Sequence, residues 1–425
     1  MSGRDGGGMG PLRDGQTVAV IGGGPGGIGC ALALKREAAR RGTDVHVIVF
    51  EGKRFGAHYN QCAGVLSPPI VSILKEHCGV TLPPELCQRE ITGYVLHSEQ
   101  RSVLLSGSEH GGTSLSVRRV EFDDFLERCA REHGIEIVQA RATDLEFRKN
   151  EVVVFTWGGT VRAAAVVGAF GLSRAMTATL ARHTPYRPPR ALETIVTKFH
   201  PDGGRSKHIP DLLGNHIHVL LPPVPRVEFG ALIPKGNHVT AILAGEALRT
   251  DDMDAFLDLP PVRRLVPGRP APEDYFKGHF PTSLARGAFG DRYVTIGDAA
   301  GLVRPFKGKG INSAILTGAM AATTMMEVGV SAGAFRCFYR ECEEITRDVW
   351  YGRLMRALAG LTSHKLSMDP VLRLAEKDAD LRGLLFDCVS GREAYRRIVL
   401  RKGNLRLALR LGAAVLLDRV WHPTA

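Results

Sequence analysis

The strongest indication of the fold lies in residues 17–29, Thr17-Val18-Ala19-Val20-Ile21-Gly22-Gly23-Gly24-Pro25-Gly26-Gly27-Ile28-Gly29. The run before the glycines is apolar and β-branched, which is typical of a buried parallel strand. Gly22, Gly24 and Gly27 complete a G-x-G-x-x-G pattern: the first makes a tight turn, the second admits a pyrophosphate and the third lets helix and strand pack closely. The helix that follows, predicted over 26–41, directs its first N–H groups at the phosphates.

A second strand is predicted over 45–50, and it ends in Glu51. Glu51 stands twenty-four residues after Gly27, where an acid in this type of unit hydrogen-bonds the ribose of a dinucleotide. Lys53 follows shortly after and is assigned to the same cofactor site. Strand, glycines, helix, strand and acid in this order predict a β-α-β unit that binds a dinucleotide.

A second glycine-rich segment lies far along the chain: Val294-Thr295-Ile296-Gly297-Asp298-Ala299-Ala300-Gly301, then Pro305, then Gly308-Lys309-Gly310-Ile311-Asn312. It resembles the flavin-binding motif of the p-hydroxybenzoate hydroxylase fold, and within that fold the geranylgeranyl reductase family. The resemblance implies that FAD is the cofactor and that Asp298 binds its ribityl chain. It also implies that a helix starting near Gly310 directs its positive end at the flavin. The residues of this segment that we assign to the cofactor are Gly297, Asp298, Pro305, Gly308, Gly310, Ile311 and Asn312.

Three further stretches carry the resemblance, which covers about residues 15–330. Residues 119–126 are similar to the family's R-x-x-F-D-x-x-L, which implies that Arg119 lies near the FAD. Cys62-Ala63-Gly64-Val65-Leu66-Ser67-Pro68 resembles a cysteine-containing loop beside the flavin, and residues 231–239 resemble the family's "FPKG" hairpin.

Some residues depart from the family's pattern. Phe170 stands where a G-A-D-G segment usually has its acid, and Lys309 stands where an acid is common. The hairpin over 231–239 lacks the aromatic residues that usually precede its proline. These departures leave open a substrate other than the family's long isoprenoids.

The predicted fold class is α/β: a Rossmann-like FAD-binding domain of the p-hydroxybenzoate hydroxylase type, an inserted antiparallel β-sheet substrate domain and a helical C-terminal region. The FAD-binding domain is expected in three parts, because its two glycine-rich segments lie so far apart. The expected boundaries are a flexible tail over 1–16, the FAD-binding parts over 17–90, 118–190 and 286–330, substrate-side strands over 91–117, the substrate sheet over 191–285 and the helical region over 331–425.

The composition is that of a soluble globular protein, with 44% hydrophobic and 23% charged residues among 425. No apolar run approaches the roughly 20 residues of a membrane span, and residues 1–16 lack the apolar core of a signal peptide. Eight cysteines without a C-x-x-C pair predict free thiols in a reducing cytoplasm. The net charge of +11 raises nucleic acid as a partner, but no basic motif interleaved with aromatic residues supports it, so we predict none.

Positive charge is concentrated in residues 391–425, which contain eight Lys or Arg against two acids. Lys402, Arg406 and Arg410 recur every four residues in the leucine-rich stretch 401–417, which predicts a basic amphipathic helix. Two interpretations stay open: a packed terminal helix with a solvated basic stripe, or a peripheral contact with an anionic membrane.

Cys62, His58 and Tyr59 are the candidate catalytic residues, because they share one loop beside the expected flavin. Cys62 either orders the substrate and assists protonation, or is a small packing residue in a tight loop. His58 and Tyr59 are candidate proton donors or ordinary loop residues. His216 and His218 face the same side of a predicted strand, but spacing places no third ligand, so no metal site is predicted.

The resemblance favours an FAD-dependent oxidoreductase that reduces a C=C bond of an apolar isoprenoid or lipid substrate by hydride transfer from reduced flavin. Three alternatives stay open: a flavin-dependent monooxygenase on the same fold, a quinone-linked flavoprotein electron carrier and a non-redox use of FAD. Gly301 stands where those monooxygenases usually have His, which favours reduction. No second G-x-G-x-x-G follows a strand, so the expected electron donor is transiently bound NAD(P)H or a ferredoxin.

Overall fold

The fold was analysed in a computed structural model, which describes residues 8–57, 62–98, 100–106, 113–200, 213–266, 274–304, 310–365, 368–391 and 393–402. A six-stranded sheet has the order β18-β19-β12-β1-β2-β8. Its strands are parallel except for the antiparallel pair of β18 and β19. Their bounds are β1 Thr17–Ile21, β2 His46–Phe50, β8 Glu136–Val138, β12 Ala165–Gly168, β18 Phe289–Gly290 and β19 Tyr293–Thr295. The sheet therefore gathers strands from widely separated parts of the chain.

Both faces of this sheet are covered. On β1, Val18 and Val20 face the core shared with α1 (Pro25–Arg40), α3 (Arg119–Glu132) and α8 (Ile311–Glu327), while Ala19 and Ile21 face the opposite core. The opposite core lies under α4 (Arg174–His183) and a three-stranded sheet of β9 (Ala142–Phe147), β10 (Val152–Thr156) and β11 (Gly159–Ala163). Because both faces are buried, β1 is apolar at each position after Thr17.

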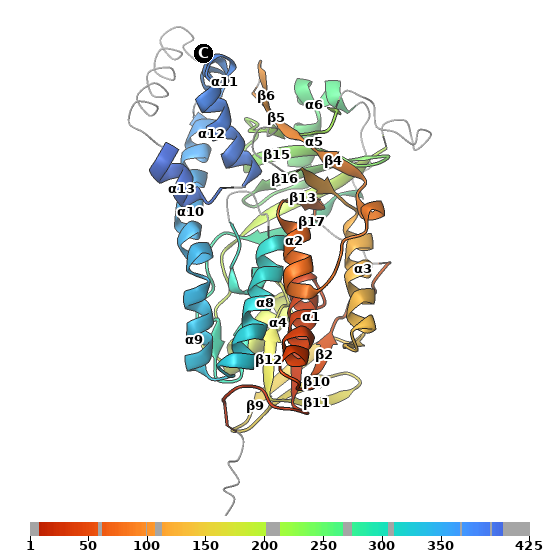
Figure 1. The fold of residues 1–425 in the computed structure, drawn as a ribbon. Coiled ribbons are helices and arrows are strands. Elements are labelled where there is room, and N and C mark those ends of the chain that lie inside the picture. Colours follow the sequence, from red (N-terminus) through yellow and green to blue (C-terminus); the bar gives the residue numbers. More distant parts are fainter. Residues whose placement is uncertain are drawn as a thin grey trace, which may run out of the picture.

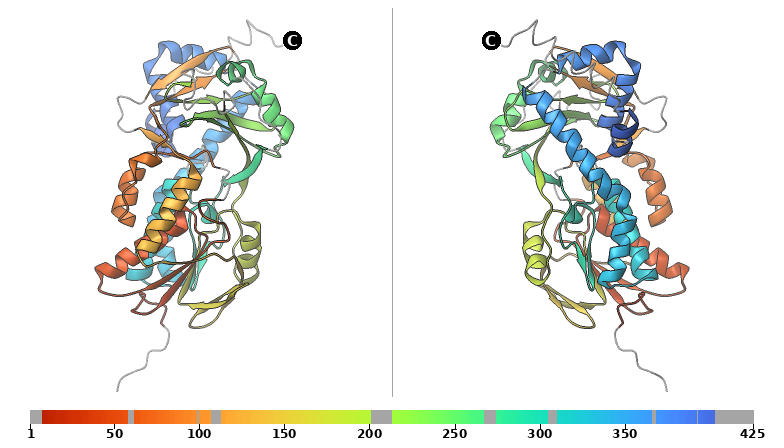
Figure 2. Two further views of the ribbon diagram at one scale, coloured as in Figure 1. Left: turned by 90° about the vertical axis from the view of Figure 1, so that its right-hand side faces the viewer. Right: turned by 90° about the vertical axis from the view of Figure 1, so that its left-hand side faces the viewer.

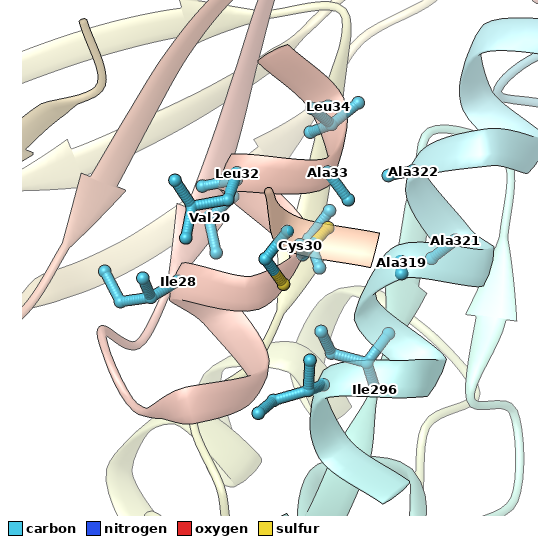
Figure 3. Packing of buried hydrophobic residues seen from close by; sticks show 14 of the residues in the cluster. Val20, Ile28, Cys30, Leu32, Ala33, Leu34, Ile296, Ala319, Ala321 and Ala322 are labelled. Carbon is cyan, nitrogen blue, oxygen red and sulfur yellow. The ribbon is translucent and has the colours of Figure 1, made fainter. Parts of the chain in front are cut away.

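Helices α1 and α8 pack side by side on the sheet (Figure 1). Small residues make the close approach: a Cβ on Gly318 would lie 2.7 Å from the carbonyl oxygen of Gly26. Cys30 and Ala33 of α1 point toward α8, where Ala319 and Ala322 lie (Figure 3). This contact brings the two glycine-rich segments of the sequence together at one edge of the sheet.

A seven-stranded sheet forms the second lobe, in the order β17-β13-β16-β15-β14-β5-β6. One face is covered by α5 (Thr250–Leu257) and α6 (Pro260–Leu265), and the other packs partly on α11 (Asp369–Lys377) and α12 (Ala379–Ser390). The strands are β5 Gly93–His97, β6 Ser102–Ser106, β13 Ala191–Phe199, β14 His216–Leu220, β15 Val227–Pro234, β16 Val239–Gly245 and β17 Phe276–Pro281.

The antiparallel description of this sheet holds except at one pair, because β5 pairs with β14 in parallel. Strands β5 and β14 lie far apart in the sequence, so no hairpin turn fixes the direction in which they pair. Burial fixes its register instead: Tyr94 and Leu96 join the same core as Ile217 and Val219 of β14.

A small antiparallel sheet joins β3 (Val65–Leu66), β7 (Ser114–Ser116) and β4 (Arg89–Ile91) between the two lobes. Helix α2 (Ile70–Ile73) follows β3 and is continued by a π-helical turn, η1 (Leu74–Cys78). A 3₁₀ turn, η2 (Pro84–Leu86), comes next. Helices α4, α5 and α6 and strand β9 were not predicted. The short helix α7 (Gly297–Ala300) is formed by the second glycine-rich segment.

Helices α9 (Ala332–Glu341), α10 (Glu343–Lys365) and α13 (Tyr395–Arg397) continue the chain along one side of the molecule, from the six-stranded lobe toward the seven-stranded lobe (Figure 2). Arg356 of α10 holds this side to β15 through a bidentate ion pair with Glu228, at 2.6 and 2.8 Å. The last described element is a π-helical turn, η6 (Ile398–Lys402). Most of the basic helix predicted over 401–417 lies outside the described residues.

Candidate functional site

One large cavity, of about 1550 Å³, lies between the two lobes. Its walls include the glycine turn after β1, the Cys62 loop, the start of α8 and one face of the seven-stranded sheet. A typical pocket for a single small ligand measures roughly 300–1,000 Å³. This cavity therefore has room for a dinucleotide and a second molecule.

The glycine turn gives the cavity a cradle for phosphate. Gly22 has φ of +110°, and a Cβ there would lie 2.4 Å from the carbonyl oxygen of Ala169, so only glycine fits the turn. A Cβ on Gly24 would meet nothing within 4 Å, which leaves open space in front of the N-terminus of α1. Among the described residues no side chain caps that N-terminus, so its first N–H groups are available to an anionic ligand. Gly27 does not line the cavity; a Cβ on it would lie 1.9 Å from the Gly22 oxygen, so it acts through packing.

Glu51 and Lys53 lie where the sequence predicts them, in the cavity wall at the end of β2. The Glu51 carboxylate accepts hydrogen bonds from the backbone N–H groups of Gly23, at 2.9 Å, and Lys53, at 2.8 Å. These bonds orient the carboxylate beside the glycine turn. Each carboxylate oxygen can accept more than one hydrogen bond, so Glu51 can still receive the hydroxyl groups of a ribose.

Asp298 and the start of α8 form the other end of the cradle. Gly297, Asp298, Gly310, Ile311 and Asn312 all line the cavity. Within the described part of the chain the Asp298 carboxylate has no hydrogen-bond donor, and a Cβ on Gly310 would lie 3.0 Å from its Oδ1. Burial raises the pKa of Asp298 to about 6, and the nearby Arg119 opposes this rise. A half-buried carboxylate that lacks a donor among the described residues fits the hydroxyl groups of a ribityl chain, so the residues present fit FAD.

Arg119 is the buried cation of the site. Its guanidinium donates to both oxygens of Asp123 at 2.8 and 3.1 Å, one turn further along α3, and both side chains are buried. Burial disfavours the charged form, but Asp123 and the adjacent Cys62 together hold the pKa of Arg119 above its usual range. Arg119 lines the cavity together with Cys62, and the guanidinium therefore places positive charge beside the thiol.

The Cys62 loop is held in place by a lysine that the sequence analysis did not single out. Lys235, only 3% exposed, donates from Nζ to the carbonyl oxygens of Ala63 at 2.7 Å, Gly64 at 2.8 Å and Val117 at 2.9 Å. Burial lowers its pKa to about 7, against the attraction of Cys62. The signal was present, because Lys235 is the lysine of the stretch that resembles the "FPKG" hairpin.

A second contact, from α8, also holds the Cys62 loop; we call this contact and the one made by Lys235 the two clamps. The Asn312 side-chain amide donates to the carbonyl oxygen of Ser67 at 2.9 Å, so it fixes the other end of the loop. Gly64 lies between the clamps with φ of +65°, and a Cβ there would lie 2.3 Å from the Val117 oxygen. The loop is thus tied to both lobes, and Asn312 has a positioning role besides its place in the cavity wall.

The far wall of the cavity is apolar. It is the face of the seven-stranded sheet that α11 and α12 leave uncovered, and its side chains are Ile217, Val219, Phe229, Ala231, Ile233 and Ile242. Phe170, which replaces the expected acid, also lines the cavity and packs edge-on against Tyr186. A substrate against these side chains would meet hydrocarbon, while Lys277 and His279 of β17 line the cavity elsewhere on the same sheet.

His58, Tyr59, Pro305 and Gly308 lie outside the described residues, so their predicted roles stay predictions. His218 is buried beside His97, with 2.8 Å between Nδ1 of His218 and Nε2 of His97. In the described part of the chain no three His, Cys, Asp or Glu side chains are grouped to hold a metal ion.

Comparisons with known proteins bear on the fold and on the cofactor. No family model matches the chain. The curated menaquinone reductase of Mycolicibacterium smegmatis is 26% identical over 344 residues, which are 74% of this chain and 77% of that protein. A geranylgeranyl bacteriochlorophyll reductase-like protein from Thermoplasma acidophilum superimposes with a TM-score of 0.67 at 18% identity, over 95% of this chain and 100% of that one.

A third comparison includes the cofactor. A variant of Klebsiella pneumoniae HpxO, solved in complex with FAD, has a TM-score of 0.58 and 18% identity, over 93% of this chain and 99% of that one. The chain has the fold of FAD-binding flavoproteins of the p-hydroxybenzoate hydroxylase type. This confirms the predicted fold class, and the reductase-like neighbour confirms the resemblance drawn from the motifs. One fold of this kind hosts several reactions, so the reaction has to be argued from the site.

Proposed function

We propose that this protein is an FAD-dependent oxidoreductase that reduces a C=C bond in the isoprenoid part of an apolar or lipid substrate. The observation that carries the proposal is one cavity that is lined by the dinucleotide cradle, by Cys62 and by the apolar face of the seven-stranded sheet. A hydrocarbon chain against that face is removed from water, which favours binding. The relative named menaquinone reductase supports a substrate of this kind, because a menaquinone carries a polyprenyl tail.

FAD held by Glu51, Asp298 and the N-terminus of α1 would, when reduced, supply a hydride for one carbon of the double bond. The other carbon needs a proton, and the protein must supply it in surroundings that exclude water. Among the described residues we assign this proton to the Cys62 thiol, which would be reprotonated from solvent after each turnover. Arg119 and Lys235 both interact with Cys62, so positive charge lies on this side of the cavity. His58 and Tyr59 remain proposed donors in the same loop.

The electron donor is proposed to be NAD(P)H, bound only transiently, or a ferredoxin. Mixing the oxidised holoprotein anaerobically with NADPH separates the two. Bleaching of the flavin absorbance without any carrier protein supports the nucleotide, whereas bleaching that requires reduced ferredoxin supports the protein donor.

Reduction of the quinone ring is the second candidate, and the name of the same relative favours it. The two reactions leave different products. A reduced ring returns to the starting quinone in air, whereas a reduced tail keeps its two added hydrogens. A monooxygenase would instead consume dioxygen and add an oxygen atom to its substrate.

The test uses FAD-loaded protein reduced with dithionite and mixed anaerobically with menaquinone in detergent. We expect the flavin to reoxidise and the quinone to gain two hydrogens that survive exposure to air. Cys62→Ser should slow this by about 100-fold or more, the usual contribution of a positioned proton donor, while its flavin content stays normal. Cys337→Ser is the matched control, because Cys337 is exposed on α9. Equal rates for Cys62→Ser and the native chain would leave Cys62 as a packing residue.

A further inference from the structure

One exposed surface of the protein combines large apolar side chains with arginines. On α10, positions 347, 350 and 354 follow the helical period and so share one stripe. Trp350 is 69% exposed and Leu354 is 48% exposed. The guanidinium of Arg353 lies over the Trp350 ring, 5.1 Å from its centre. Arg347 forms an ion pair with Glu343 one turn before it.

The stripe continues onto the elements that pack against α10. Helix α13 contacts α10, and its Arg396 and Arg397 are exposed. Leu400, in the η6 turn that follows, is 62% exposed. We call this region the α10–η6 surface; it consists of Arg347, Trp350, Arg353, Leu354, Arg396, Arg397 and Leu400. Helix α10 runs along the side of the molecule that faces the viewer on the right of Figure 2.

The cavity opens at this surface. Arg347, Arg396, Arg397 and Leu400 are exposed to solvent and also line the cavity that contains the dinucleotide cradle. Side chains that belong both to a cavity wall and to the outer surface mark its mouth. The mouth is bordered here by three arginines and an exposed leucine and also by two acids, Glu341 and Glu344. Trp350 and Leu354 lie next to it on α10.

We propose that the α10–η6 surface docks on an anionic lipid bilayer, so that a lipid substrate enters the cavity directly from the membrane. The docking stands on the exposed residues alone, and the entry route rests on the function proposed above. Tryptophan and leucine insert readily at the boundary of headgroups and acyl chains, while arginines attract anionic headgroups. None of the helices within the described ranges is long and apolar enough to cross a membrane, so the contact is peripheral.

The sequence adds charge of the same sign directly after these residues. Arg401 and Lys402 end the η6 turn, and Arg406 and Arg410 follow in the chain. Positive charge from these residues complements an anionic bilayer better than it complements a neutral one. An acidic protein or a second copy of this chain would be an alternative occupant, and the test below distinguishes both.

The test reads the position of Trp350 directly in the full-length protein. The chain has three tryptophans, and replacing Trp157 and Trp421 by Phe leaves Trp350 as the reporter. We expect its fluorescence to shift to shorter wavelength with vesicles of phosphatidylcholine and phosphatidylglycerol, and to be quenched by brominated acyl chains. Vesicles of phosphatidylcholine alone, or high salt, should produce a much smaller effect.

A matched control comes from the turn between β10 and β11, where Trp157 is 91% exposed. A protein with Trp157 as its only tryptophan should show no shift and no quenching. The double variant Trp350→Ser/Leu354→Ser should bind the anionic vesicles about tenfold more weakly or worse, because it loses most of the apolar surface that inserts. Its activity on substrate dissolved in detergent should be unchanged, since neither side chain lines the cavity.

Several results would overturn the proposal. An unshifted Trp350, or full vesicle binding by the double variant, would mean that another segment holds the membrane. A lipid-free dimer that the double variant dissociates would assign the surface to self-association, and a Trp350 shift with an acidic protein but not with vesicles would assign it to that partner. Loss of C=C reduction in detergent with vesicle binding intact would refute the proposed function and leave the docking in place.

Discussion

Replacing Lys235 by Met tests whether this buried lysine builds the active-site loop. The ammonium donates to three backbone carbonyls, at 2.7, 2.8 and 2.9 Å. The Gly64 carbonyl keeps a second donor, the Val117 N–H at 2.8 Å. The carbonyls of Ala63 and Val117 therefore lose most, and each buried carbonyl left without a donor costs about 1–3 kcal/mol.

Part of this loss is offset, because the methionine no longer buries a charge. We expect the free energy of unfolding to fall by about 2–4 kcal/mol, measured by urea unfolding of the FAD-loaded protein. Turnover should fall much further than flavin content, since the loop carries Cys62 whereas the cradle lies on other elements. Lys149→Met is the matched control, because Lys149 is an exposed lysine in the turn between β9 and β10.

The free energy of unfolding should also depend on pH in a direction that follows from the pKa of Lys235. Burial lowers the pKa of Lys235 to about 7 from its ordinary value of 10.5. Between these pH values the unfolded chain holds a proton that the folded chain lacks, so the stability of the native chain rises with pH. The Met variant lacks this group. The stability difference between the two proteins should therefore widen by roughly 1.4 kcal/mol per pH unit above pH 7. A difference that narrows with rising pH would refute this reasoning, and a Met variant with native turnover would refute the clamp.

The remaining predictions concern the cofactor and the histidine pair. Glu51→Ala should weaken FAD binding by about 1–3 kcal/mol, measured by equilibrium titration; unchanged affinity would mean that Glu51 does not bind the ribose. FAD affinity should fall as the pH drops through about 6, because burial raises the pKa of Asp298 to about 6 and its protonated form is a weaker, uncharged acceptor for a ribityl hydroxyl. Asp298→Asn should abolish this pH dependence, and its persistence would exclude Asp298 as the cause. Burial lowers the pKa of His97 to about 4 from 6.5, so stability present above pH 6.5 should be lost as the pH falls toward 4, by roughly 3 kcal/mol. His97→Gln should show a smaller loss in acid-unfolding experiments, and an equal loss would place the titrating group elsewhere.

The cofactor half of the site could be predicted because its signals are local. β1, the glycine turn, α1 and β2 lie within one stretch of sequence, and each carries its own pattern of apolar residues and glycines. The structure places Gly22, Gly24, Glu51 and Asp298 in one cavity as those patterns indicate. The role of Gly27 was also readable, since the pattern itself assigns that position to packing.

The features that were missed depend on contacts between distant residues. Lys235 meets Ala63 across 172 positions of sequence, and no periodicity reports such a contact. The parallel pairing of β5 with β14 has the same origin, because its register is set by a core that residues from both strands share. Helix α4 did leave a local signal, the Ser173 side chain that accepts from the Met176 N–H at its N-terminus. Only Met176, Thr179 and Leu180 of α4 are buried, so the helix shows little apolar periodicity in the sequence.

The two clamps on the Cys62 loop explain why its geometry belongs to neither lobe alone. Lys235 projects from the seven-stranded sheet, whereas Asn312 projects from the helix that packs on the six-stranded sheet. Each bond is made to backbone carbonyls, so it fixes the path of the loop whatever side chains the loop carries. The thiol of Cys62 is consequently positioned by the distance between a cofactor-binding lobe and a lobe that offers an apolar wall. A loop held from both lobes can keep a proton donor between a cofactor and an apolar substrate. Reduction of a C=C bond requires this arrangement, because the hydride comes from the cofactor and the proton must come from the protein.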